Sequence, residues 1–224
     1  MIPLRDANPS RTTPVVTIIL IITNLLVYFY QWTLAGAEQL IPFFDRWAII
    51  PAQLTSNFSA EFYTPFTAMF LHGSWMHLLG NMLYLWIFGD NIEDRLGKGR
   101  YLLFYLSGGL AATTAQILVD PGSPVPNIGA SGAIAAVLGG YLILFPRARV
   151  LTIVVRYVTQ VPAYVVLGFW FVLQLFQGVG SLGADISQGG GVAFFAHVGG
   201  FVAGAIFIRL FQIGLEPRYS DDTY

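Results

Sequence analysis

Six apolar segments follow one another along the chain, and polar or turn-forming residues separate them. A helix needs about 20 mainly apolar residues to cross the hydrocarbon core of a membrane. The pattern predicts membrane-spanning helices over residues 13–34, 74–96, 100–119, 128–145, 161–180 and 192–213. The chain is therefore expected to be an all-α membrane protein that forms a bundle of six transmembrane helices.

The second span has a clear start signal, because Gly73 and Ser74 interrupt an apolar stretch that begins at residue 66. A serine hydroxyl can accept a free backbone N–H at the start of a helix. We therefore predict Ser74 as the N-cap and expect residues 66–71 to lie in the membrane interface. The whole segment 35–73 is rich in aromatic residues, which favour the headgroup zone, so an ordered and partly immersed loop is expected there.

The positive charges predict the orientation of the spans, because short cytoplasmic loops of membrane proteins carry an excess of Lys and Arg. Of the eleven Lys and Arg residues, only Arg46 lies in segment 35–73, whereas the other ten lie at the termini or in the second–third and fourth–fifth connections. Six spans with both termini in the cytoplasm account for this distribution. The predicted organisation is a cytoplasmic N-terminus (1–12), a membrane domain (13–213) with an extracytoplasmic loop (35–73), and a cytoplasmic tail (214–224).

Composition agrees with a membrane protein, since 55% of the residues are hydrophobic and only 10% are charged. Soluble domains carry about 25% charged residues. The net charge of -1 offers no reason to expect nucleic acid as a partner, and the absence of cysteine excludes disulfides, thiolate metal sites and a cysteine nucleophile. A cleaved signal peptide is the alternative for the first apolar run, but the run is longer than a signal core of about 7–15 residues and five spans follow it.

Two polar residues in the predicted spans form a candidate catalytic pair. Ser131 is expected roughly 5 Å below the outer surface at the start of the fourth span, and His197 roughly 7 Å below it in the sixth, from the helical rise per residue. Both helices enter the membrane from the same face. A serine hydroxyl becomes a good nucleophile only when a nearby base takes its proton, and histidine is the usual base. Taken singly, a serine in a membrane helix more often serves packing and a lone histidine is more often structural, so the prediction depends on their common depth.

A second pair, His77 and Asn81, is spaced four residues apart and therefore shares one face of the second helix. Acyl transfer develops negative charge on the carbonyl oxygen, which preorganised donors must meet. The Asn81 amide, a His77 N–H and the Ser131 backbone N–H are suited to this role. The remaining histidine, His72, lies five residues before His77 on a different face, and loop packing or hydrogen bonding is the favoured interpretation for it.

Glycines in the fourth and sixth spans predict that these two helices touch, because small residues allow membrane helices to approach closely. The candidates for this packing role are Gly132, Gly200 and Gly204. The sequence lacks the residues that other membrane proteases need. It has no His-Glu-x-x-His pair for a zinc protease and no two facing intramembrane aspartates for an aspartyl protease. Repeated halves around a midplane site, typical of transporters, are also missing.

Taken together, these motifs resemble the rhomboid family of intramembrane serine proteases over about residues 13–213. The resemblance lies in residues 77–81 of the second span, in Gly129-Ala130-Ser131-Gly132 of the fourth, and in residues 196–200 with Gly204 of the sixth. It implies a rhomboid-like six-helix bundle with a Ser131–His197 dyad that has no third acid. It also implies an oxyanion hole of His77, Asn81 and the Ser131 N–H, and a site open to the extracytoplasmic side. Neither a metal nor a cofactor is expected.

The same resemblance implies substrates that are single-span membrane proteins, cleaved within the lipid bilayer where their helices unwind. The short termini suggest a minimal prokaryotic form in the plasma membrane. Two positions depart from the family's pattern: Tyr63-Thr64 stands where many relatives have Trp-Arg, and Ala135 stands where many have an aromatic ring beneath the base histidine. The alternative function is a non-catalytic rhomboid-like protein that binds membrane clients, a class usually marked by loss of the serine or the histidine.

Overall fold

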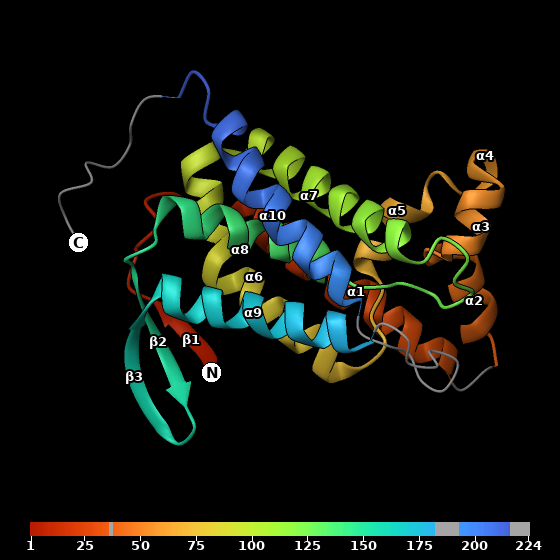
Figure 1. Ribbon diagram of the computed structural model, residues 1–224, viewed down its shortest axis with the longest axis horizontal. Helices are drawn as coiled ribbons and strands as arrows, with labels where there is room; N and C mark the ends of the chain where they lie inside the picture. The colour runs from red at the N-terminus through yellow and green to blue at the C-terminus, as the bar shows by residue number, and fades with distance from the viewer. Residues whose placement is uncertain (36–37, 182–192, 216–224) are drawn as a thin grey trace.

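The computed structural model describes residues 1–35, 38–181 and 193–215 and is mainly helical (Figure 1). Within these residues, six helices of 14 to 22 residues form a bundle. They are α1 (Val15–Ala35), α6 (Trp75–Leu96), α7 (Lys98–Val119), α8 (Ser131–Leu144), α9 (Ala163–Ser181) and α10 (Phe194–Phe211). The predicted start of the last span at residue 192 and the predicted tail over residues 216–224 lie outside the described residues.

Four of these helices, α1, α7, α9 and α10, are long and apolar enough to cross a membrane. The central helix α8 is apolar but has only 14 residues. Helix α6 has 22 residues, but polar residues and a charged end lower its hydropathy, and it is not among the four. The prediction of a mainly helical integral membrane protein is therefore confirmed.

The bundle is built around α8, which packs against α6, α7, α9 and α10. A Cβ added at Gly204 of α10 would collide with the backbone carbonyl of Ala136, and one added at Gly200 would collide with that of Gly132. In the same way, a Cβ added at Gly139 of α8 would collide with the backbone carbonyl of Phe201 in α10. The backbones of α8 and α10 are thus in direct contact, as close approach through small residues allows.

We expect Gly204→Ala to destabilise the protein, because the new methyl group would push α10 away from the α8 backbone. Overpacking of this kind costs about 1–3 kcal/mol, whereas the helix propensity of alanine over glycine recovers about 1 kcal/mol at most. Thermal unfolding in detergent should show a lower midpoint. Gly168→Ala in α9 is the matched control, since a Cβ there meets nothing within 4 Å and should leave the midpoint equal or higher. Equal midpoints for the two variants would contradict the tight α8–α10 contact.

At one end of the bundle, the segment before α6 folds into short helices (Figure 1). These are α2 (Leu40–Trp47), α3 (Pro51–Ser56), α4 (Phe58–Glu61), α5 (Thr64–Thr67) and the 3-10 helix η1 (Ala68–Phe70). The prediction for Ser74 is confirmed, since it is the N-cap of α6 and its hydroxyl accepts the His77 N–H at 3.1 Å. The loop is tied to α1 by Gln31, whose side chain bonds both the backbone C=O and N–H of His72.

At the other end lies a feature that the all-α prediction missed. Strands β1 (Ile2–Asp6), β2 (Arg149–Val154) and β3 (Tyr157–Pro162) form an antiparallel sheet in the order β1-β2-β3. The hairpin β2–β3 projects sideways from the ends of the helices (Figure 1). The strands are too short to register as spans, and β1 pairs with a strand about 150 residues further along the chain. Because β3 includes Val161 and Pro162, the fifth helix begins at Ala163 instead of residue 161.

The sheet is joined to the bundle by Asp6, whose carboxylate accepts hydrogen bonds from the Tyr141 hydroxyl at 2.7 Å and the Asn91 amide at 3.0 Å. Burial raises the pKa of Asp6 from 3.8 to about 6; the nearby Asp90 adds to this shift, and the hydrogen bond from Tyr141 opposes it. The folded protein therefore binds a proton at a pH where the unfolded chain has released it.

As a consequence, we expect this carboxyl to reduce stability as the pH rises from about 4 to 6, and the loss to persist above that range. Relative to Asp6→Asn, which cannot ionise, wild type should lose about 1–2 kcal/mol across that range, a figure that allows for partial exposure of the carboxyl. Unfolding in detergent, followed as a function of pH, measures the difference. Asp45→Asn, at an exposed carboxyl of α2, serves as the control. Parallel pH profiles for wild type and Asp6→Asn would contradict the prediction.

Candidate active site

A cavity of about 720 Å³ lies within the bundle, close to the end that carries the short helices α2–α5. Its walls come from α6, α8, α9 and α10 and from residues 126–128. All four polar residues predicted from the spans line it: His77, Asn81, Ser131 and His197. The structure therefore brings together side chains from three different helices that are up to 120 residues apart in sequence.

Ser131 is the first residue of α8, so its backbone N–H has no partner within the helix. The residue two places before it, Gly129, has φ +126° and is held by its N–H to the Ala68 carbonyl at 2.9 Å. A Cβ at Gly129 would lie 2.8 Å from the His77 ring. Both the backbone conformation and the space therefore require glycine here. The loop that presents Ser131 is packed directly against His77.

The Ser131 hydroxyl lies 2.7 Å from Nε2 of His197. Helix α10 carries His197 at its fourth residue, and the imidazole is buried, with 8% of its surface exposed. A neutral imidazole has one nitrogen that donates and one that accepts. With Nε2 as the acceptor, the hydroxyl donates to it, which is the arrangement in which histidine can withdraw the proton of a nucleophile.

The other nitrogen of His197, Nδ1, contacts the side-chain oxygen of Gln174 at 2.5 Å. Trp170, one turn earlier in α9, packs beside the imidazole with 5.8 Å between ring centroids. On the α8 side, Ala135 is fully buried and offers only a methyl group. Sequence reasoning missed Gln174 and Trp170. The available signal was an amide in an apolar span, but nothing in the sequence directs that amide toward His197.

Asn81 and His77 occupy the α6 wall of the cavity. The Asn81 amide nitrogen lies 2.8 Å from Nε2 of His72, and the rings of His72 and His77 meet edge to face at 5.0 Å. Burial, helped by His77, lowers the pKa of His72 to about 3, so its ring is neutral and can accept this hydrogen bond. One Asn81 N–H is therefore held by His72. The second has no hydrogen-bond partner among the described residues and is available to the cavity.

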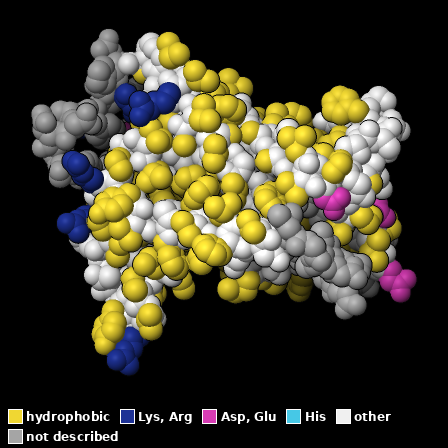
Figure 2. Space-filling view, viewed as in Figure 1, with side chains coloured by type: hydrophobic (Ala, Val, Ile, Leu, Met, Phe, Trp, Pro, Cys, Tyr) yellow, Lys and Arg dark blue, Asp and Glu magenta, His cyan; other side chains and the backbone are white. Residues whose placement is uncertain are grey.

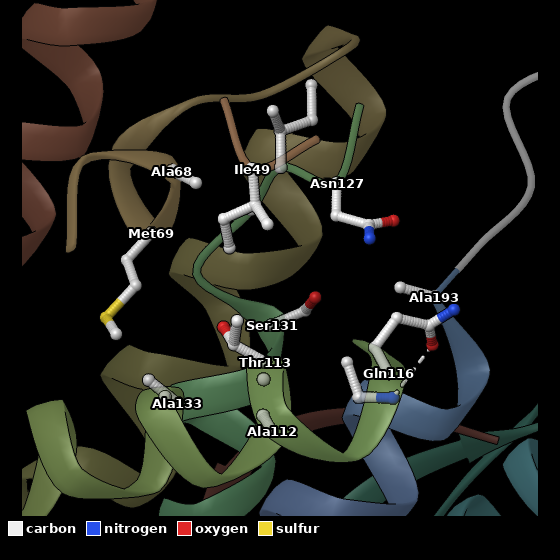
Figure 3. Close-up of a pocket in the computed structure, with 15 residues that line it drawn as sticks. Ile49, Ala68, Met69, Ala112, Thr113, Gln116, Asn127, Ser131, Ala133 and Ala193 are labelled. Carbon is white, nitrogen blue, oxygen red and sulfur yellow. Dashed lines mark hydrogen bonds between the residues drawn. The ribbon is translucent and has the colours of Figure 1, made fainter. Parts of the chain in front are cut away.

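A second, much smaller pocket of about 40 Å³ lies beside Ser131 on the side of α7. In Figure 3, Ser131 lies among Ile49, Asn127 and Gln116. The side chain of Gln116 accepts the Ala196 N–H at 3.2 Å, which ties α7 to the start of α10. A space of this size can hold water where polar groups line it, and three side chains besides Ser131 offer such groups: Thr113, Gln116 and Asn127. Ser131 thus lies between a large cavity and a water-sized pocket.

Tyr63 and Thr64, which stand where many relatives have Trp-Arg, lie in the short-helix region, and their side chains stabilise the local structure. The Tyr63 hydroxyl donates to the Arg46 carbonyl at 2.9 Å, and the Arg46 guanidinium lies 5.3 Å from the Tyr63 ring centroid. The Thr64 hydroxyl donates to the Glu61 carbonyl at 2.9 Å. Among the described residues there is also no group of three His, Cys, Asp or Glu side chains that could hold a metal ion.

The comparisons with known proteins all point to one family. The family model of the Rhomboid domain matches residues 59–212. Rhomboid protease GluP of Bacillus subtilis is 31% identical over 88% of this chain and 37% of its own length. Rhomboid protein 1, mitochondrial, of Saccharomyces cerevisiae is 30% identical over 62% of this chain and 38% of its own. RHOMBOID-like protein 5 of Arabidopsis thaliana is 31% identical over 68% of this chain and 44% of its own length. The chain thus spans about two fifths of the length of these relatives.

Proposed function

The chain belongs to the rhomboid family, and on that basis we propose that it is an intramembrane serine endopeptidase in which Ser131 and His197 perform the reaction. The observation that carries this proposal is the 2.7 Å contact between the Ser131 hydroxyl and Nε2 of His197, at the wall of a cavity inside the bundle. Both reacting groups are present, whereas a non-catalytic client-binding protein would be expected to have lost one of them.

The reaction follows from this geometry. The Ser131 oxygen attacks the carbonyl carbon of the scissile peptide bond while its proton passes to Nε2 of His197. The imidazolium then protonates the departing amine, the C–N bond breaks, and an acyl ester remains on Ser131. A water molecule, activated by the now neutral His197, hydrolyses the ester and returns the proton to the Ser131 oxygen. The small pocket beside Ser131 supports this last step, because it offers room for water next to the ester.

Negative charge on the carbonyl oxygen in the tetrahedral intermediate requires hydrogen-bond donors. We assign this role to the Ser131 backbone N–H, the free N–H of Asn81 and a ring N–H of His77. The start of α8 supports the assignment, because the first backbone N–H groups of a helix lack partners and its dipole favours an anion. The hydrogen bond from Asn81 to His72 supports it further, since it limits rotation of the amide.

The membrane arrangement that we propose has six spans, with both termini in the cytoplasm and the site open to the extracytoplasmic side. Figure 2 supports this orientation: on the visible face, the Lys and Arg side chains gather at the end that carries the sheet, and the acidic side chains lie toward the other end. The short helices α2–α5 lie away from the basic end (Figure 1). Ser131 lines a pocket together with Ile49 and Ala68 of that short-helix region. With α6 and the short α8 as spans, the membrane would be thinned near α8 or the helix would be reached by water from outside.

The proposed substrates are single-span membrane proteins whose helix unwinds near small residues, so that a peptide carbonyl can reach Ser131.

To test the function, the full chain in liposomes is incubated with a single-span test substrate and, separately, with a fluorophosphonate probe that labels activated serines. Cleavage within the span together with labelling is expected. A folded protein that neither cleaves nor labels would contradict the proposal and make client binding the leading function.

A further inference from the structure

Helix α9 holds the imidazole of His197 from two directions. Gln174 meets Nδ1 with its side-chain oxygen, and Trp170 packs against the ring at 5.8 Å and also against Phe201 at 6.0 Å. The two residues are four apart, so they project from the same face of α9. Ala135 of α8, at a position where many relatives have an aromatic residue, is fully buried and supplies no ring. The orientation of the base is therefore set by α9, in a chain whose α8 lacks an aromatic residue at that position.

The orientation of the Gln174 amide favours one of the two tautomers of His197. With the amide oxygen facing Nδ1, the hydrogen bond favours the proton on Nδ1 and leaves Nε2 to accept the proton of Ser131. If the NH₂ group faced Nδ1, the proton would lie on Nε2, and the histidine could not act as a base toward Ser131. A neutral amide performs this selection without placing a negative charge inside the membrane, where carboxylates are costly.

The other glutamine of α9, Gln177, offers a comparison for the contact between Gln174 and His197. Gln177 lies one turn further along the helix and is exposed, whereas Gln174 is partly buried. A polar side chain in a membrane helix is usually retained because it has a partner or a function. Of these two glutamines, only Gln174 has a hydrogen bond to the candidate base in the described part of the chain.

We propose that Gln174 is a positioning residue that holds His197 in its Nδ1–H tautomer, while Trp170 fixes the plane of the ring. The inference rests on the proposed protease function, in which His197 removes the proton from Ser131. It assigns to α9 the orienting role that a buried acid, hydrogen-bonded to Nδ1 of the histidine, performs in triads.

Activity provides the first test. Gln174→Met keeps the length and volume of the side chain but removes the strong acceptor. We expect kcat to fall about 10- to 100-fold, the effect of losing one hydrogen bond to a group that becomes charged, while KM stays within about twofold. Gln174→Glu restores an acceptor oxygen and should recover most of the lost rate. Gln177→Met is the matched control and should have wild-type kcat. Wild-type kcat in Gln174→Met, or no recovery in Gln174→Glu, would overturn the proposal.

The tautomer itself provides a test that needs no activity. The chain has three histidines, so nitrogen NMR of histidine-labelled protein in detergent should resolve each ring, and His197→Ala identifies its signals. Wild type should show the Nδ1–H tautomer at His197, and Gln174→Met should show a mixture. A wild-type Nε2–H tautomer, or an unchanged spectrum in Gln174→Met, would refute the positioning role. If the tautomer depends on Gln174 but the folded wild type cleaves nothing, the protease proposal fails and the positioning contact stands.

Discussion

Ser131→Ala is expected to abolish cleavage of a membrane-embedded substrate, with kcat lowered by roughly 10⁴-fold or more, as in other serine hydrolases that lose their nucleophile. The variant removes the only oxygen that lies 2.7 Å from Nε2 of His197 among the described residues. His197→Ala is expected to have an equally large effect, because without its base the hydroxyl keeps its proton. The two losses should not add, since the two residues act as one unit.

Labelling with a fluorophosphonate separates loss of chemistry from loss of substrate binding. Wild type should be labelled, and neither variant should be. Ser107→Ala, at a partly buried serine of α7, is the matched control and should cleave and label like wild type. Ser131→Ala and Ser107→Ala should unfold at the wild-type midpoint, because each removes a single oxygen atom. His197→Ala should unfold at a lower midpoint, because it removes a buried ring that contacts Gln174 and Trp170. Undiminished cleavage by Ser131→Ala would show that Ser131 is not the nucleophile.

The second large effect is expected for Asn81→Ala, which removes a donor from the proposed oxyanion site. Loss of one such donor lowers kcat by about 10²–10³-fold, because the donor acts on charge that is present only in the transition state. KM should therefore change little. The structure sharpens this expectation, since the bond to His72 holds the amide in place before substrate arrives. Cleavage rates over a range of substrate concentrations separate kcat from KM.

Asn24→Ala provides the control for Asn81→Ala. Asn24 is also a buried asparagine in a membrane helix, but its amide donates to the Leu20 carbonyl of its own helix, and it does not line the cavity. Its loss should leave kcat within about twofold of wild type, as expected for a residue that does not contact the transition state. If Asn81→Ala keeps a wild-type kcat, Asn81 does not stabilise the oxyanion, and the Ser131 N–H and His77 remain as the proposed donors.

The position of His72 explains how the proposed oxyanion site is held in place without a charge. Its lowered pKa of about 3, which results mainly from burial, keeps the ring neutral at physiological pH, so it accepts from Asn81 and does not repel it. Its backbone is in turn tied to Gln31 of α1. The favoured interpretation of His72 from the sequence was hydrogen bonding or loop packing, and the structure places it in a hydrogen bond with a candidate site residue.

The sequence by itself determined the features that depend on helical spacing and local chemistry. Apolar segments of about 20 residues predict spans, and the N-cap signal of the Ser74 hydroxyl located the start of α6. The fixed rise of a helix placed Ser131 and His197 at one depth, and a spacing of four placed His77 and Asn81 on one face. These quantities require only counting along one segment, which is why the candidate site could be assembled before any contact was known.

Only the tertiary structure decided which polar groups support that site and where the chain leaves helical form. Helices in lipid are apolar on all sides, so hydrophobic periodicity does not reveal which face of α9 meets His197. Gln174 and Trp170 therefore became visible only with α9 and α10 packed side by side. The sheet was missed for a related reason: β1 pairs with β2, a strand about 150 residues further along the chain, and pairing at that sequence separation leaves no local pattern.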